Sequence, residues 1–322
     1  MYMRRCLQLA ANGLGRVRPN PLVGCVVVND GRITSEGYHQ EYGQNHAERN
    51  ALLRDGNYRG ATLYVNLEPC SHYGKTPPCA DLIIEKGIKR VVCCNDDPNP
   101  LVAGNGFRKL EAAGIEVVRH VLEEEGRELN RRFFTFMEQQ RPYVILKWAE
   151  SKDGFMAPAT TGPYWLSTQE QNRLNHRWRT EEAAILVGSE TCLLDKPSLT
   201  PRHYLGPAPQ PVVLDRRNRL AFLTQSELKE QKEKSDSSFR FDCDKKKWLV
   251  LQNQTIPEVL NELYEHKLQS VIVEGGRKVL DAFIESGLYD EVRILRSPQR
   301  LGSGLKAPAI PPIAHNRLII ID

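Results

Sequence analysis

Several features that would define a membrane or nucleic-acid-binding protein are missing from this sequence of 322 residues. No apolar run approaches the roughly 18 residues that a membrane-spanning helix needs. Charge of one sign is also scarce, because 44 Lys and Arg oppose 40 Asp and Glu and leave a net charge of +4. Residues 1–13 form a short amphipathic helical pattern without the apolar core of a signal peptide. We therefore expect a soluble, cytoplasmic protein with no membrane or nucleic-acid partner, in which a local phosphate site remains possible.

Cysteine is sparse, and its distribution is uneven. Eight cysteines in a chain of this length are too few for a disulfide scaffold. Six of them lie in the first half, namely Cys6, Cys25, Cys70, Cys79, Cys93 and Cys94. Thiols in such a chain are more often buried, metal-bound or catalytic than paired, and the count alone does not choose among these.

The length suggests about two domains, and the first half alternates strand and helix patterns. We expect strands at 23–28, 62–67, 90–94 and 116–118, and helices at 47–53, 80–86, 107–113 and 122–139, the last one long and charged. The turn Asn29-Asp30-Gly31 would lead the first strand into a hairpin partner. Such alternation predicts an α/β fold with a largely parallel sheet.

A second domain is expected to begin after the Arg141-Pro142 step, because the residue before a proline is disfavoured in a helix. We therefore divide the chain into residues 1–142 and 143–322. The second half repeats the alternation, with helices at 168–181, 257–266 and 277–286 and strands at 143–148, 184–187, 211–214, 248–251, 271–273 and 291–295. Residues 227–247 are charge-dense and predict a solvated loop or frayed helix without an assigned function. No Rossmann fingerprint follows any expected strand.

The strongest chemical pattern combines His46-Ala47-Glu48 with Pro69-Cys70 and Pro78-Cys79. Zinc favours Cys sulfur and His nitrogen, and a catalytic zinc site uses three protein ligands and a water. We predict His46, Cys70 and Cys79 as the ligands. Glu48 would carry the proton between the activated water and a leaving amine. His-x-Glu with Pro-Cys is the signature of zinc-dependent nucleobase deaminases, although a single His or Cys is more often a packed core residue.

Four segments of the first half carry a family resemblance. PNPLVGCVVVNDG, HAERNAL, LYVNLEPCSHYGKTPPC and DDPNPLVAGNG resemble the deaminase half of the bifunctional deaminase-reductases of bacterial riboflavin biosynthesis. The resemblance implies a cytidine-deaminase-like three-layer α/β/α domain that hydrolytically deaminates a diamino-pyrimidinone ribosylamine 5′-phosphate. It also implies that the substrate pocket is lined by Asn20, His39, Lys75, Asp97 and Asn99.

The second half resembles the reductase domain of the same family in LKWAESKDG, ILVGSETCLLDKPSLTPR, VVLDRRNR and IVEGGRKVLDAF. The resemblance implies a dihydrofolate-reductase-like α/β domain that uses NADPH to reduce the ribose to a ribityl chain, and it implies a homo-oligomer. It places the cofactor at Ala149, Trp165, Thr191, Asp195, Gly276, Arg277, Lys278, Val279, Leu280, Asp281 and Ala282. It places the substrate at Arg179, Leu199, Arg202 and Glu274.

The leading hypothesis is therefore a two-domain enzyme that performs consecutive deaminase and reductase steps. A second hypothesis keeps the deaminase but makes the C-terminal domain a docking or oligomerising module. A third, a nucleic-acid-editing deaminase, shares the zinc core but conflicts with the weak net charge and the eight residues between the two cysteines. A nonenzymatic zinc module ranks last, because three ligands with an adjacent Glu describe an open site.

Overall fold

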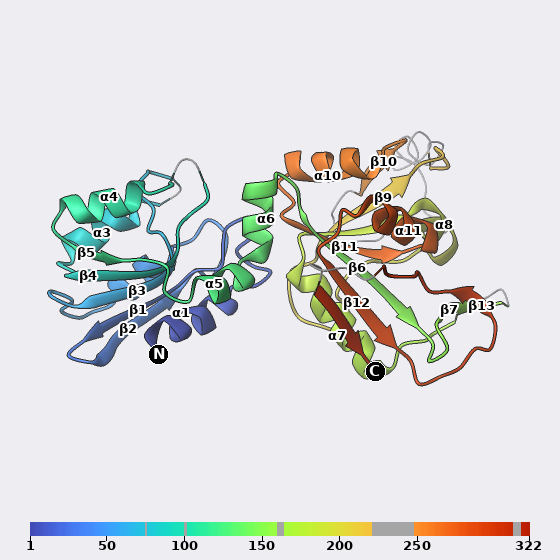
Figure 1. Cartoon of the computed structure of the whole chain (residues 1–322), viewed down its shortest axis with the longest axis horizontal. Helices are drawn as coiled ribbons and strands as arrows, with labels where there is room; N and C mark the ends of the chain where they lie inside the picture. Colours follow the sequence, from blue (N-terminus) through green and yellow to red (C-terminus); the bar gives the residue numbers. More distant parts are fainter. Residues whose placement is uncertain (75, 100–101, 160–163, 221–247, 312–316) are drawn as a thin grey trace, which may run out of the picture. The chain divides into compact units, whose positions relative to one another are not determined.

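The computed structural model describes residues 1–74, 76–99, 102–159, 164–220, 248–311 and 317–322. The chain forms two compact units, Met1–Gln140 and Arg141–Asp322, each built around its own sheet (Figure 1). The charged segment 227–247, Lys75 and Cys243 lie outside the described residues. Within the described part, no helix has the length and apolar character needed to cross a bilayer.

The first unit contains a five-stranded sheet in the order β2-β1-β3-β4-β5. Its strands are β1 (Gly24–Asn29), β2 (Arg32–Tyr38), β3 (Thr62–Leu67), β4 (Arg90–Asn95) and β5 (Glu116–Val118). β1 runs antiparallel to both β2 and β3, whereas β3, β4 and β5 are parallel. The expected hairpin forms at Asp30-Gly31, where both residues have positive φ. This sheet is thus mixed, and the expectation of a largely parallel sheet is wrong for the first unit.

Helices cover both faces of this sheet, as expected for three layers (Figure 1). One face packs against α2 (Ala47–Leu52), α3 (Cys79–Glu85) and α4 (Asn105–Ala112), and the other against α1 (Tyr2–Ala11) and α5 (Glu123–Leu129). Neighbours in β1 alternate between the two cores, because Val27 faces α2 while Val26 and Val28 face α1. The continuous apolar run of β1 therefore reflects burial on both faces.

The single helix expected over 122–139 is wrong. The chain forms α5 and then α6 (Arg131–Gln139), separated at Asn130, whose φ of −97° and ψ of 21° leave the helical region. Asn130 is buried, and its side chain accepts the N–H of Leu22 at 2.8 Å and donates to the Leu22 carbonyl at 2.9 Å. These two side-chain bonds tie Asn130 to a distant backbone segment, which a periodicity pattern does not reveal.

The second unit contains a seven-stranded sheet in the order β10-β9-β8-β11-β6-β12-β14, in which every pairing is parallel. The strands are β6 (Tyr143–Glu150), β8 (Ala184–Gly188), β9 (Gln210–Asp215), β10 (Leu249–Gln252), β11 (Ser270–Gly275), β12 (Glu291–Arg296) and β14 (Arg317–Ile321). A small antiparallel pair joins β7 (Phe155–Pro158) to β13 (Gly304–Lys306). The parallel expectation is confirmed for this unit.

Helices also cover both faces of the second sheet. α10 (Ile256–Glu265) and α11 (Arg277–Ser286) pack on one face, and α7 (Gln169–Glu181) and α8 (Ser189–Asp195) pack on the other. The sequence analysis did not predict β7, α8, β13 or β14. α7 begins with a capping box between Thr168 and Gln171, which explains its sharp start.

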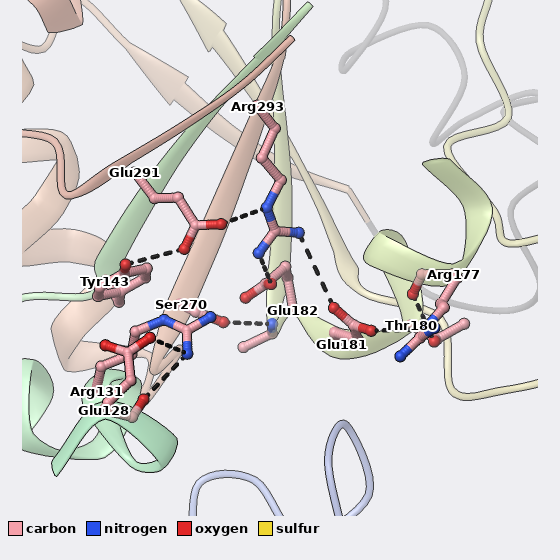
Figure 2. Close-up of polar contacts among 11 residues, drawn as sticks. Glu128, Arg131, Tyr143, Arg177, Thr180, Glu181, Glu182, Ser270, Glu291 and Arg293 are labelled. Atoms are coloured by element: carbon pink, nitrogen blue, oxygen red, sulfur yellow. Dashed lines mark hydrogen bonds and ion pairs between the residues drawn. The ribbon is translucent and has the colours of Figure 1, made fainter. Parts of the chain in front are cut away.

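A buried polar network lies at the beginning of β12 and the end of α7 (Figure 2). Arg293 donates to Glu291 at 2.6 Å and to Glu182 at 3.5 Å, and its guanidinium lies 5.0 Å from the centre of the Trp178 ring. Tyr143 donates its hydroxyl to Glu291 at 3.0 Å. Because a charge in a buried strand needs partners, this network fixes β12 against β6 and α7.

Candidate active sites

Three side chains in the first unit converge as a metal site. His46 is the N-cap residue of α2, Cys70 lies in the loop after β3, and Cys79 is the first residue of α3. His46 Nδ1 lies 3.5 Å from each sulfur, and the three candidate ligand atoms lie within 4.8 Å of one another. Tetrahedral zinc, with bonds of about 2.3 Å to sulfur and 2.0–2.1 Å to nitrogen, places those atoms about 3.5 Å apart. The three residues therefore fit a zinc ion.

The local electrostatics favour the thiolate at Cys70, whereas the hydrogen bond to Cys70 and burial raise the pKa of Cys79. The hydrogen bond from the Cys79 thiol, together with His46, lowers the pKa of Cys70 to about 4. The backbone N–H of Cys79 also donates to the Cys70 sulfur at 3.4 Å. Because thiolates and not thiols bind metal, Cys70 is prepared as a ligand before any ion arrives.

Glu48 lies in the first turn of α2 and is almost completely buried. Burial raises its pKa to about 7, although the nearby His46 opposes this shift. A carboxyl group that titrates near neutrality can both accept and release a proton. A bound divalent cation would favour its carboxylate form, which is the form that accepts a proton from water.

Two of the predicted substrate residues form a fixed pair beside the metal cluster. The His39 ring lies 5.5 Å from the His46 ring, centre to centre. His39 Nδ1 lies 3.0 Å from the Asn45 carbonyl, which can only accept, so Nδ1 carries the proton. His39 Nε2 therefore accepts from the Asn20 amide at 3.1 Å. Burial lowers the pKa of His39, which keeps this neutral tautomer.

Asp97 and Asn99 follow the end of β4, and Lys75 falls outside the described residues. Asp97 Oδ1 accepts the N–H of Asn99 at 2.9 Å. Burial, followed by smaller contributions from Glu68 and Cys70, raises the pKa of Asp97 to about 7. Glu68, which the sequence analysis missed, is buried at the end of β3. Its signal in the sequence is an acidic residue directly after an apolar strand and before Pro69-Cys70.

The second unit brings three charged groups together near the carboxyl ends of two parallel strands, β6 and β11. Arg179 on α7 binds both oxygens of Glu274 on β11, at 2.8 and 2.7 Å. Lys147 on β6 lies 3.7 Å from the same carboxylate. Burial alone would raise the pKa of Glu274, yet Arg179 and Lys147 lower it to about 2. Lys147 was missed, although a lysine inside the apolar run YVILKWAE is a detectable signal.

The other predicted substrate residues of this unit lie on the segment after α8. Arg179 donates to the carbonyl of Thr200, which ties this segment to the charged cluster. Leu199 is buried, whereas Arg202 is exposed and lines a cavity of about 620 Å³ formed by residues 200–206 and 208. The N–H of His203 points to Nδ1 of the buried His176 at 3.4 Å.

Most of the predicted cofactor residues lie in β6 or in the helices that follow β8 and β11, whereas Trp165 lies in the loop before α7. Gly276 has a φ of 69° and forms the turn into α11, and a side chain there would meet the Thr191 hydroxyl. Ala149 is half-buried, whereas Trp165 is exposed. Burial raises the pKa of Asp195. Val279, Leu280 and Ala282 pack in the hydrophobic core. Arg277 pairs with Asp281, and Lys278 pairs with Glu190. Ligands of open parallel sheets bind at such strand ends.

Comparison with known proteins finds a different family model for each of the two units. Residues 1–95 match the cytidine and deoxycytidylate deaminase zinc-binding region, and residues 142–316 match the RibD C-terminal domain. The chain is 40% identical to the riboflavin biosynthesis protein RibD of Aquifex aeolicus over 314 residues, which cover 94% of this chain and 88% of the relative. It is 37% identical to RibD of Escherichia coli K12 over 326 residues, with 94% and 88% covered.

A solved structure from Thermotoga maritima extends the likeness to the fold. That protein is a diaminohydroxyphosphoribosylaminopyrimidine deaminase/5-amino-6-(5-phosphoribosylamino)uracil reductase, and it matches with a TM-score of 0.83 and 40% identity over 95% of this chain and 88% of its own. The likeness thus spans both units and both candidate sites. The chain belongs to the RibD family of riboflavin biosynthesis, as a bifunctional enzyme with an N-terminal cytidine-deaminase-like domain and a C-terminal reductase domain.

Proposed function

We propose that the chain deaminates 2,5-diamino-6-ribosylamino-4(3H)-pyrimidinone 5′-phosphate and then reduces the product with NADPH to 5-amino-6-ribitylamino-uracil 5′-phosphate. The observation that carries the deaminase step is the 3.5 Å spacing of His46 Nδ1 from both cysteine sulfurs. The activities given for the Thermotoga maritima relative support the choice of substrate.

In the deaminase step, His46, Cys70 and Cys79 would hold a zinc ion, which would lower the pKa of a bound water enough to make it a nucleophile at neutral pH. Glu48 accepts a proton from the attacking water at its carboxylate and delivers it to the departing amine. Burial of Glu48 keeps bulk water from competing for that proton. The side chain therefore moves the proton within one enclosed site.

Polar groups of the first unit orient the pyrimidinone. Asn20 and Asn99 offer amide donors and acceptors, and the Asp97 carboxyl can accept or, when protonated, donate. His39, held neutral by Asn45 and Asn20, shapes the wall beside the metal ligands. Lys75 would bind the 5′-phosphate through its ammonium group.

In the reduction step, the chain would bind the deaminated intermediate and NADPH and orient them, and the cofactor would supply a hydride for C1′. Arg202 would bind the 5′-phosphate from the wall of the cavity formed by residues 200–206 and 208. Arg179 is held by Glu274 and donates to the carbonyl of Thr200 in the same segment. Glu274 and Leu199 complete the substrate site. The cofactor phosphates suit the Thr191 hydroxyl, Lys278 and the glycine turn that starts the ten-residue helix α11. Ala149, Trp165, Asp195 and the rest of 276–282 would complete the cofactor site.

The proton shuttle is tested with Glu48→Gln. This variant should keep about one zinc per chain, because Glu48 is not among the three ligands, and deaminate at least about 100-fold more slowly. Ammonia release and NADPH absorbance are followed together on the purified chain, with metal content measured by elemental analysis. Glu85→Gln, an exposed carboxyl of α3, is the matched control. Normal ammonia release by Glu48→Gln would refute the assignment.

The reductase assignment is tested separately, by supplying the deaminated intermediate with NADPH or NADH. Turnover with NADPH is expected, and its absence would favour the docking-module hypothesis.

We further propose a cytoplasmic enzyme, which the seven free cysteines of the described residues support. Its assembly into a homo-oligomer stays a prediction that light scattering can test.

A further inference from the structure

One buried carboxylate of the first unit holds a loop and has no assigned role in the reaction. Glu68 Oε1 accepts the N–H of Gly106 at 2.9 Å, and Oε2 accepts the N–H of Gly104 at 3.0 Å. The N–H of Asp97 also points to Oε2, at 3.5 Å. A side chain that follows β3 thus binds both ends of the segment that leads from β4 to α4.

These donors need an acceptor that the segment itself does not supply. The first N–H groups of a helix have no intrahelical partner, and Gly104 and Gly106 lie at the start of α4. A carboxylate satisfies several such groups at once and is favoured at the positive end of a helix. Without Glu68, the buried N–H of Gly106 and the partly buried N–H of Gly104 would lose their acceptor, and the start of α4 would lose its fixed position.

The packing against Glu68 is close. A Cβ atom on Gly106 would lie 2.0 Å from the Pro69 carbonyl oxygen and 3.1 Å from Glu68 Oε1. The backbone of α4 therefore rests directly on Glu68-Pro69, immediately before the candidate ligand Cys70. The same contact surface connects the metal site to the segment that carries Asp97 and Asn99.

We propose that Glu68 is a positioning residue of the deaminase, which holds residues 97–99 and 104–106 so that Asp97 and Asn99 can bind the pyrimidinone. This inference rests on the proposed substrate contacts of those two residues. Both oxygens of Glu68 already accept backbone N–H groups, and we assign it no contact with the reacting atoms. Its loss should weaken substrate binding and leave proton transfer through Glu48 intact.

Glu68→Gln tests the proposal sharply. Whichever way the amide is turned, its NH2 group faces an N–H donor, at either Gly106 or the pair Gly104 and Asp97. At least one hydrogen bond is lost, and the deaminase KM should rise about tenfold or more, with kcat changed less than about threefold. Hydrogen exchange at Gly104 or at Gly106, whichever then faces the amide NH2, should accelerate about tenfold or more, with zinc content unchanged. Glu85→Gln should alter none of these values.

The outcomes separate this proposal from the proposed function. Loss of zinc, a fall in kcat at constant KM, or unchanged exchange at Gly104 and Gly106 would overturn the role of Glu68. Asp97→Ala tests the substrate contact independently: a normal KM there would refute the contact, even if Glu68→Gln loosens the segment. Should Glu68→Gln not fold, exchange in the zinc-loaded wild-type chain decides, because a rapidly exchanging Gly104 amide would exclude the proposed hydrogen bond.

Discussion

The buried cluster of the reductase domain holds two cations and one carboxylate, and this imbalance predicts opposite effects for two substitutions. Glu274 binds Arg179 through both oxygens and lies 3.7 Å from Lys147. Glu274→Gln preserves the shape of the side chain but leaves two buried cations without their counter-charge. Breaking a buried pair in this way costs about 3–5 kcal/mol. In a domain of this size, that corresponds to a fall in Tm of about 6–20 °C.

Lys147→Met should behave differently. Burial and the adjacent Arg179 lower the pKa of Lys147, which shows that its charge is unfavourable in the folded state. Methionine fills a similar volume without that charge and leaves Arg179 and Glu274 as a neutral pair. We expect stability to stay equal or to rise by about 1 kcal/mol. We expect reductase turnover to fall nevertheless, because Lys147 lies beside Glu274, a proposed substrate residue.

Calorimetry on the full chain measures both variants, with the deaminase transition as an internal reference. NADPH oxidation with the deaminated substrate supplies the kinetic comparison. Lys267→Met, which removes an exposed lysine of the same domain, is the control and should change neither value. If Lys147→Met destabilises the domain as strongly as Glu274→Gln, the argument from net charge is refuted. If its turnover is normal, Lys147 does not serve the reaction.

Two further perturbations test the packing and the titration behaviour. Gly24→Ala should destabilise the first unit by about 2 kcal/mol, because the added Cβ would lie 2.1 Å from the Cys6 carbonyl oxygen of α1. Urea unfolding measures this change, and unchanged stability would refute the close approach. Burial, followed by Arg179 and His203, lowers the pKa of His176 to about 4. The unfolded chain therefore takes up a proton between pH 6.5 and 4 that the folded chain refuses, and stability should fall by about 2 kcal/mol over that range. His176→Gln should flatten this part of the Tm–pH curve, and an unchanged slope would contradict the assignment.

Most regular elements could be predicted because their apolar patterns are local. The expected bounds of β3 and β5 coincide with those observed, since turn residues enclose each apolar run. The break at Asn130 could not be predicted, because it depends on two hydrogen bonds to Leu22, over a hundred residues earlier. β7 and β13 were missed for a similar reason: each is only a few residues long and is defined by pairing with the other.

The two candidate sites differ in how many of their residues could be predicted from residue chemistry without the family resemblance. Zinc accepts few ligand types, so His46, Cys70 and Cys79 stood out by chemistry and were then found within 4.8 Å of one another. The reductase residues came from family resemblance, because arginines and carboxylates occur on any surface. Glu68 was missed because its three partners are backbone N–H groups, which leave no trace in a sequence pattern.

Strand register explains why Lys147 and Glu274 meet although 126 residues lie between them. β6 and β11 are parallel neighbours, and Val273 is paired with Leu146. The next residue on each strand is Glu274 and Lys147, so the two charges project from adjacent strands near the carboxyl ends, where ligands of parallel sheets bind. The sequence shows each charge at the end of an apolar run, but only the pairing of the strands makes them partners. A one-residue slip of either strand would turn one of the two side chains to the opposite face and abolish the pair. The register of β6 against β11 is therefore as much a part of the proposed reductase site as the side chains themselves.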